Sequence, residues 1–207
     1  MRKVKVGVIG VGRLGQHHAR IFSKINNVEL IAVVDINQKH AEKIASLYHS
    51  VFYTNYERIL GSVEAVSIAT PTPSHYSIAN YFLQNGVHCL IEKPITDNLA
   101  HAEELLDLAR KRNVVLQIGH IERFNPAVVA ARKYVNQPKF IEARRLGPYD
   151  PRTSHIGVVL DLMTHDLDIV LSFVNSKIEN LDALGTSVLS DHEDIANVRM
   201  KFFNGCV

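Results

Sequence analysis

The sequence predicts an α/β fold, in which a doubly wound parallel sheet is followed by a partial α+β second domain. Up to about residue 119, nearly continuous apolar runs alternate with longer helical patterns, as expected when helices cover both faces of a sheet. After residue 119 the alternation stops and strand patterns cluster. The sequence therefore predicts two domains, 1–119 and 120–207, of which the second is incomplete.

In the first predicted domain, strands and helices follow one another in turn. Strands are expected at Val4–Ile9, Val28–Val34, Ala65–Ala69, Val87–Ile91 and Val114–Ile118. Helices are expected at Leu14–Ile25, Gln38–Tyr48, Ser74–Gln84 and Leu99–Arg112. Because a predicted helix lies between each strand and the next, we expect the strands to run parallel.

The second predicted domain mixes helices and strands without regular alternation. Its expected elements are a helix at Asn125–Val135, a strand at Lys139–Leu146, a helix at Leu160–Val174, and strands at Ile178–Val188 and Ile195–Phe203. The last strand enters a turn at Asn204-Gly205, with only two residues after it. We therefore expect a C-terminally shortened form of a longer protein, whose exposed sheet edge favours a homo-oligomer.

A G-x-G-x-x-G pattern follows the first strand and leads into the first helix. In this pattern the first glycine permits a tight turn, the second lets backbone N–H groups approach phosphates, and the third lets the helix pack close to the strand. The pattern predicts a Rossmann-type dinucleotide site, and a glycine-rich turn that binds nothing is the alternative. The turn residues expected to bind the cofactor are Gly10, Gly12, Arg13, Leu14 and Gly15.

Asp35 ends the second strand, about 20 residues beyond Gly15, as the dinucleotide pattern requires. A carboxylate there accepts hydrogen bonds from ribose hydroxyls and repels a 2′-phosphate, so NAD is favoured over NADP. Lys39 and Arg13 are near enough in sequence to soften that repulsion. Asp35 could instead cap the helix that begins at Gln38.

Two further strand ends carry polar groups, and ligands of open α/β sheets bind beyond the carboxyl ends of the strands. The segment after Ala69 predicts cofactor contacts by four residues, although a plain loop with Ser74 as helix cap is the alternative. Those four are Thr70, Pro71, Thr72 and His75. At the next strand end, Glu92 and Lys93 precede a proline, which stops the strand and places the lysine at the same edge. A solvated surface lysine is the alternative.

Asp161 and His165 are four residues apart on a predicted helix and therefore share a face. A carboxylate near the helix start is favoured by the helix dipole, which also disfavours a protonated imidazole. His165 is thus a candidate general base, and a surface pair without function is the alternative.

Composition excludes several classes of protein. The formal net charge is +2, which is too small to indicate a general nucleic-acid or membrane surface. No apolar run approaches the length of a membrane span, and the N-terminus is a strand rather than a signal peptide. Two cysteines suggest reduced thiols in a cytoplasmic protein, and no metal-ligand spacing is present.

Three motifs in this order resemble the Gfo/Idh/MocA oxidoreductases over essentially the whole chain. They are the glycine pattern, Glu92-Lys93-Pro94, and the D-x-x-x-H arrangement of Asp161 and His165. In that family the lysine, aspartate and histidine line the nicotinamide and the substrate, so the resemblance implies catalytic roles for Lys93, Asp161 and His165. The family's Lys-Pro turn also positions the cofactor. Family members carry substantially more sequence at the C-terminus, which affects substrate binding and oligomerisation.

The stretch Gly119–Pro126 resembles a branch of this family that oxidises the 3-hydroxyl of UDP-N-acetylglucosamine. Independently, residues 119–155 hold seven basic and three acidic residues, a local charge of +4 that suits an anionic nucleotide sugar. Arg132 and Lys133 are interpreted as solvated. The expected substrate ligands are Arg123, Asn125, Arg144 and Arg145.

The sequence thus predicts an NAD-dependent dehydrogenase of a sugar hydroxyl, with His165 or Lys93 as the general base and Asp161 orienting the pair. A reductase of an imine, aldehyde or linear tetrapyrrole on the same fold is an alternative. A nucleotide-binding module without catalysis is another.

Overall fold

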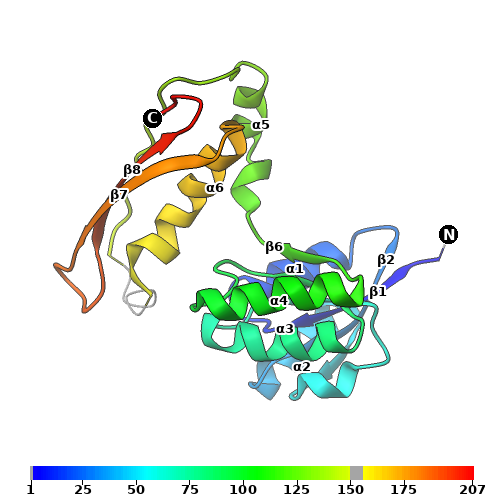
Figure 1. Ribbon diagram of the computed structural model, residues 1–207. Coiled ribbons are helices and arrows are strands. Elements are labelled where there is room, and N and C mark those ends of the chain that lie inside the picture. Colours follow the sequence, from blue (N-terminus) through cyan, green and yellow to red (C-terminus); the bar gives the residue numbers. More distant parts are fainter. Residues whose placement is uncertain (1, 150–155) are drawn as a thin grey trace. The chain divides into compact units, whose positions relative to one another are not determined.

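The computed structural model describes residues 2–149 and 156–207. The chain divides into two compact units, Met1–Gly119 and His120–Val207, which are considered separately below (Figure 1).

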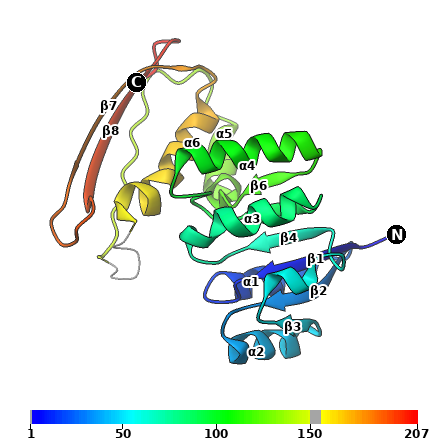
Figure 2. The ribbon, with the colours of Figure 1, turned by 60° about the horizontal axis from the view of Figure 1, so that its bottom comes forward.

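Unit 1 is a six-stranded parallel sheet with helices on both faces. Its strands are β1 (Val4–Ile9), β2 (Val28–Val34), β3 (Val51–Tyr53), β4 (Ala65–Ile68), β5 (His88–Ile91) and β6 (Leu116–Ile118). Its helices are α1 (Gly15–Phe22), α2 (Gln38–Tyr48), α3 (His75–Gln84) and α4 (Leu99–Arg112), with 3-10 turns η1 (Tyr56–Ile59) and η2 (Thr72–Ser74). The strand order is β3-β2-β1-β4-β5-β6, and Figure 2 shows β4, β1, β2 and β3 in this order across the sheet. The predicted doubly wound parallel sheet is confirmed.

Both faces of the sheet are buried, which explains the nearly continuous apolar runs. Val8 packs with α1 and α2 in one cluster of buried side chains, whereas its neighbour Ile9 packs with α3 and α4 in another. Successive side chains of a strand point to opposite faces, so a strand covered on both sides needs an apolar residue at nearly every position.

The edge strand β3 was not predicted from the sequence. It has only three residues, and two of them, Val51 and Phe52, are exposed. A run this short, with no clear apolar pattern, is not distinguishable from a loop by periodicity. It forms because its backbone pairs with β2, from Ala32 to Val34.

A row of backbone hydrogen bonds aligns the residues that follow five of the strands. Each N–H donates to a carbonyl at the end of the neighbouring strand. These bonds are Asp35 to Tyr53 at 3.1 Å, Gly10 to Val34 at 2.8 Å, Ala69 to Ile9 at 2.8 Å, Glu92 to Ile68 at 2.9 Å and Gly119 to Ile91 at 2.8 Å. The sheet therefore brings these five residues to one level at its carboxyl edge.

The described residues of unit 2 form two helices, two helical turns and a two-stranded antiparallel sheet. Its elements are η3 (Ile121–Phe124), α5 (Pro126–Arg132), the π-helical turn η4 (Val159–Met163), α6 (Thr164–Phe173), β7 (Ile178–Thr186) and β8 (Ile195–Phe202). Strands β7 and β8 form a long hairpin. Its loop is held by Asp194, whose Oδ2 accepts hydrogen bonds from the backbone N–H groups of Val188, Leu189 and Ser190. These bonds hold the pKa of Asp194 well below its usual value.

The strand predicted at Lys139–Leu146 is wrong. This segment has irregular backbone. It bonds to Val207 through Ile141 N–H to Val207 O at 2.9 Å and Val207 N–H to Lys139 O at 3.1 Å. An apolar alternating pattern becomes a strand only where a neighbouring backbone continues the ladder. Here the ladder ends after that contact.

The predicted turn at Asn204-Gly205 is confirmed. Gly205 has a φ of +80°, and its N–H donates to Phe202 O at 2.8 Å. The two cysteines, Cys89 and Cys206, are free and buried. Burial raises the pKa of Cys89 to about 12, which makes its thiol unreactive. Among the described residues, no helix has the length and apolar character needed to cross a bilayer.

Candidate active site

The glycine turn lies at the carboxyl edge of the sheet, between β1 and α1. Gly10 has a φ of +80°, and a Cβ there would lie 2.8 Å from Ala69 O. A Cβ on Gly15 would lie 1.7 Å from Gly10 O, so the helix can approach the strand only because this residue has no side chain. A Cβ on Gly12 would have no atom within 4 Å. The turn therefore requires glycine at positions 10 and 15 for packing, whereas Gly12 faces open space.

Asp35 connects the glycine turn to the end of β2. Its Oδ2 accepts a hydrogen bond from Val11 N–H at 2.9 Å, and its Oδ1 accepts one from Asn37 N–H at 2.9 Å. The cap of α2 is Asn37, whose side chain accepts from His40 N–H. The alternative interpretation of Asp35 as that cap is therefore wrong, and its carboxylate is held beside the turn.

The loop after β4 packs against the glycine turn and against the end of β5. Thr70 is half-buried, Pro71 is exposed, and Thr72 is buried. His75 is 1% exposed, and its Nε2 and Nδ1 lie 2.8 Å from Thr70 O and 2.9 Å from Pro94 O. The imidazole thus joins two loops of the carboxyl edge from inside the unit. Its direct contact with a cofactor stays a prediction.

The alternative cap at Ser74 is also wrong. Ser74 precedes α3, but its side chain makes no cap hydrogen bond to the helix. Its hydroxyl lies 2.7 Å from both Thr70 Oγ1 and Pro71 O. The side chain therefore stabilises the loop before the helix rather than the helix end.

Glu92 is a buried carboxylate immediately before Lys93. Its Oε1 lies 3.0 Å from His18 Nε2, and its Oε2 accepts a hydrogen bond from Lys93 N–H at 3.2 Å. Burial acts to raise the pKa of Glu92, but the hydrogen bond and charge of His18, with the N–H and charge of Lys93, outweigh it and lower the pKa. Glu92 is therefore ionised near neutral pH.

In unit 2, Asp161 lies in the π-helical turn η4 and His165 in the first turn of α6. The prediction of one regular α-helix from residue 160 is thus wrong at its start, where the turn is wider. Residues four apart still share a face in either helix type, because four residues make nearly one full turn. Both side chains are half-buried. Single-turn π-helical segments within α-helices occur frequently at functional sites.

Two of the arginines predicted to bind substrate hold this helix. Arg123 donates through Nε and Nη2 to both oxygens of Asp168, at 2.6 Å each. Arg145 makes the same kind of paired contact with Asp166, at 2.9 to 3.2 Å. In both pairs the carboxylate raises the pKa of the arginine, through the hydrogen bonds first. Asp166 and Asp168 follow His165 in the first half of α6.

The other two predicted substrate ligands also have local partners. Arg144 Nε donates to Glu142 at 2.5 Å, and both side chains are largely exposed. Asn125 caps α5 by accepting a hydrogen bond from Ala127 N–H at 3.0 Å. Their contacts with a substrate stay predictions.

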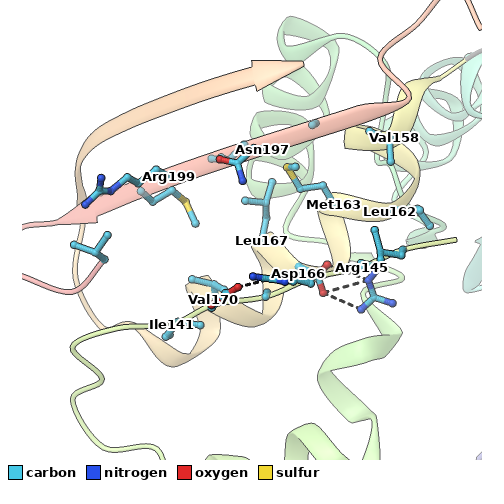
Figure 3. Close-up of a pocket in the computed structure, with 18 of the residues that line it drawn as sticks. Ile141, Arg145, Val158, Leu162, Met163, Asp166, Leu167, Val170, Asn197 and Arg199 are labelled. Atoms are coloured by element: carbon cyan, nitrogen blue, oxygen red, sulfur yellow. Dashed lines mark hydrogen bonds and ion pairs between the residues drawn. The ribbon is translucent and has the colours of Figure 1, made fainter. Parts of the chain in front are cut away.

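Unit 2 also contains a cavity of about 680 Å³ between β8, the segment from Phe140 to Leu146, and one face of η4 and α6. Figure 3 shows the ion pair of Arg145 and Asp166 at this cavity, beside Leu162 and Leu167. Among the described residues that line the cavity, neither Asp161 nor His165 appears. The cavity therefore lies on a different face of the helix from the predicted catalytic pair. No cluster of three or more potential metal ligands occurs in residues 2–149 and 156–207.

Comparison with known proteins identifies the family. The Gfo/Idh/MocA family model, described as an oxidoreductase family with an NAD-binding Rossmann fold, matches residues 4–120. The chain belongs to this family. The predicted resemblance is therefore confirmed, and the glycine turn lies within the matched region.

Several relatives are similar over most of the chain. UDP-N-acetylglucosamine 3-dehydrogenase from Acidithiobacillus ferrooxidans is 39% identical over 208 residues, which cover 100% of this chain and 66% of the relative. Its solved structure has a TM-score of 0.91 and covers 100% of this chain and 68% of that chain. Inositol 2-dehydrogenase from Rubrobacter xylanophilus is 29% identical, over 88% of this chain and 56% of the relative. This chain thus spans 66% or less of the length of these curated relatives.

A more distant structure supports the fold alone. GenD2 from gentamicin A biosynthesis, solved in complex with NAD, has a TM-score of 0.87 at 24% identity and covers 100% of this chain and 64% of that chain.

Sequence reasoning missed His18, whose ring joins the buried Glu92 to α1. One signal was available: His18 is three residues after Gly15, and residues three or four apart share a helix face. The buried residues of α1 are Gly15 and Ala19, so the face that includes position 18 contacts the sheet. The adjacent His17 is exposed. Because both residues are histidines, residue type alone does not show which of the two contacts the sheet.

Substitution of the glycines separates packing from cofactor binding. We expect Gly15→Ala to destabilise the protein by about 3 kcal/mol or more, because the new Cβ would overlap Gly10 O. Gly12→Ala should stay within about 1 kcal/mol of wild type in urea unfolding. It should still weaken NADH binding by about tenfold or more, equivalent to about 1.4 kcal/mol, since its methyl group enters the open space above the turn. Unchanged NADH binding in Gly12→Ala would contradict this assignment of the turn.

Proposed function

We propose that the protein is an NAD-dependent dehydrogenase that oxidises the 3-hydroxyl of a UDP-sugar, such as UDP-N-acetylglucosamine. The main support is the 39% identity to a UDP-N-acetylglucosamine 3-dehydrogenase over the whole of this chain. Inositol 2-dehydrogenases are more distant relatives, and inositol, the substrate in their name, is also a polyol with secondary hydroxyls. The proposed reaction is therefore oxidation of a secondary alcohol to a ketone.

The residues of the carboxyl edge fit a dinucleotide. At the start of α1 the N–H groups of Gln16, His17 and His18 already donate to the carbonyls of Gly12 and Leu14. The space above Gly12 is open, and the N–H groups that a ligand there would use are those of the glycine turn itself. A pyrophosphate in that space would accept hydrogen bonds from these N–H groups and would be stabilised by the helix dipole. The Asp35 carboxylate beside the turn suits the two hydroxyls of an unphosphorylated ribose, which favours NAD.

The chemistry is divided between cofactor and protein. NAD, when bound, accepts the hydride from the carbinol carbon. In the proposed mechanism His165 removes the hydroxyl proton, and Lys93 donates a hydrogen bond to the same oxygen as its negative charge develops. Asp161, on the same helix face as His165, orients the imidazole. In the alternative mechanism, Lys93 is the general base.

The arginines of unit 2 can bind phosphate oxygens without releasing their aspartates. A guanidinium has five N–H donors, and a paired contact with one carboxylate uses two or three of them. The Arg123 side chain is 47% exposed and that of Arg145 is 32% exposed. We propose that their remaining donors bind the diphosphate of the substrate, together with Arg144 and Asn125.

Self-association through the second sheet stays a prediction, as does a cytoplasmic location. All nine residues of β7 are exposed, including Leu181 and Leu184. An exposed strand of this length with apolar side chains is a surface on which another strand can pair.

Incubation with NAD and single sugars tests the function. We expect absorbance of reduced nicotinamide with UDP-N-acetylglucosamine and a weaker signal or none with myo-inositol. The 3-keto product should be identifiable by mass spectrometry after borodeuteride reduction. Fluorescence that shows NADH binding without turnover on any UDP-sugar or polyol would instead support a binding module. Turnover only of imine, aldehyde or tetrapyrrole substrates with NADH would support the reductase alternative.

Two substitutions identify the base. His165→Asn should lower kcat by about 100-fold or more and remove the fall of kcat/KM at low pH, where a histidine base would be protonated and inactive. Lys93→Met should lower kcat while the pH dependence from His165 persists. His192→Asn, at an exposed loop position of the same unit, is the control and should leave both constants unchanged. Nearly full turnover in His165→Asn would remove the histidine from the role of base.

Asp35→Asn tests the cofactor preference. The amide keeps the size of the side chain but removes its charge, so the Kd ratio of NADP to NAD should fall by at least about tenfold, since like-charge contact costs several kcal/mol. Direct titration of both cofactors by fluorescence quenching or calorimetry measures the ratio. Equal affinity of the wild-type protein for the two cofactors would contradict the proposal.

A further inference from the structure

A hydrogen-bonded cluster behind Lys93 connects three elements of unit 1. His18 of α1 lies between Ser67 of β4 and Glu92 at the end of β5. Its Nδ1 is 2.7 Å from Ser67 Oγ, and its Nε2 is 3.0 Å from Glu92 Oε1. The second oxygen of Glu92 accepts from Lys93 N–H at 3.2 Å. The cluster therefore ends on the backbone of the residue proposed to contact the reacting oxygen.

The direction of these hydrogen bonds follows from the ionised state of Glu92. A carboxylate only accepts hydrogen bonds, so Nε2 of His18 carries the proton that points at Oε1. The Ser67 hydroxyl can either donate to Nδ1 or accept from it, so it is a suitable partner for this ring nitrogen with or without a proton. Ser67 is completely buried and Glu92 is 7% exposed, so the serine hydroxyl and the carboxylate depend on their protein partners rather than on water.

The order serine, histidine and glutamate is that of a hydrolase triad, but its environment differs. A nucleophilic serine must reach a substrate carbonyl, whereas the Ser67 side chain lies inside the sheet with no exposed surface. Nucleophilic catalysis by this serine is therefore excluded. The burial favours a role in holding structure at the carboxyl edge.

The space around Glu92 also has a specific requirement. Gly119 follows β6, and a Cβ there would lie 3.1 Å from the carboxyl carbon and from both carboxyl oxygens of Glu92. The glycine therefore leaves room for the carboxylate to lie between α1 and the backbone of Lys93. Loss of the His18 donor would leave an ionised oxygen buried without its partner, which is costly.

The cluster also connects the two ends of the proposed cofactor site. Helix α1 begins at Gly15, directly after the glycine turn, and His18 is in its first turn. Glu92 immediately precedes Lys93. A chain of two hydrogen bonds thus joins the helix that would hold the pyrophosphate to the backbone of Lys93.

We propose that His18, acting through Glu92, is a positioning residue that sets the backbone of Lys93 relative to the glycine-turn helix. The part of this inference that concerns turnover rests on the proposed function. The part that concerns the Lys93 backbone does not, because it is a property of the protein without cofactor or substrate.

The experiment uses the whole chain with three substitutions and a matched control. His18→Leu removes the donor, and His18→Gln restores an N–H near the position of Nε2. Glu92→Gln removes the charge with little change of shape. His17→Leu is the control, because His17 is the neighbouring residue of α1 and is exposed.

The main measurement is the ¹⁵N–¹H resonance of the Lys93 amide in the cofactor-free protein. We expect an upfield proton shift in His18→Leu and in Glu92→Gln, because the hydrogen bond to the carboxylate is weakened or lost. His18→Gln should lie close to wild type, and His17→Leu should be unchanged. If His18→Leu does not fold, the comparison of His18→Gln with Glu92→Gln decides. A Lys93 amide that is the same in Glu92→Gln as in wild type would overturn the inference.

Turnover provides a second measurement. His18→Leu should lower kcat by about 10- to 100-fold, the effect of a small displacement of a reacting group, while KM for the sugar changes little. The Kd for NADH should change by less than about threefold, which corresponds to less than about 1 kcal/mol of binding free energy. Wild-type protein without turnover on any sugar would reject the proposed function and leave the amide measurement to decide the inference. A fall in NADH affinity that accounts for all of the lost turnover would overturn it.

Discussion

The row of backbone hydrogen bonds at the carboxyl edge of the sheet is the constraint on which the candidate site depends. In a parallel sheet the residue after each strand donates to the end of its neighbour, and this register places Asp35, Gly10, Ala69, Glu92 and Gly119 at one level. These residues are far apart in sequence, yet each begins a loop at the same edge. The loops that begin there can therefore place their functional groups in one region of space.

Packing around this row explains why its sequence positions are so restricted. Gly15 allows α1 to contact Gly10, and Gly119 allows the Glu92 carboxylate to lie beside it. His75 joins the loop after β4 to the one after β5 from inside the unit. The open edge is thus supported by buried polar groups whose partners are all within the protein, so the exposed groups above them have a rigid base.

The sheet and its helices were largely predictable, because burial on both faces imposes apolar residues at nearly every strand position. The exceptions have physical reasons. Strand β3 is three residues long and owes its structure to pairing with β2 rather than to its own pattern. The segment Lys139–Leu146 has a strand pattern, but its backbone pairing stops at Val207. Local sequence does not show whether a partner strand is present.

For the candidate site, motif spacing predicted roles for the glycine turn, Asp35 and Lys93, but it did not predict the residues that support them. His18 contacts Glu92 across 74 residues of sequence, and no local pattern records such a contact. The arginines of unit 2 were predicted as substrate ligands from the family resemblance and from a count of charges. A charge count does not show that Arg123 pairs with Asp168 or Arg145 with Asp166, so their role in holding α6 became apparent only from the structure.

A crystal structure of the protein with NAD tests the central claim most directly, namely that the aligned edge of unit 1 forms one cofactor site. The account predicts the pyrophosphate at the N–H groups of the glycine turn, a ribose at Asp35, and the nicotinamide beside Lys93, with the contact of His18 and Glu92 intact. NAD bound away from the glycine turn, or a nicotinamide remote from Lys93, would contradict it.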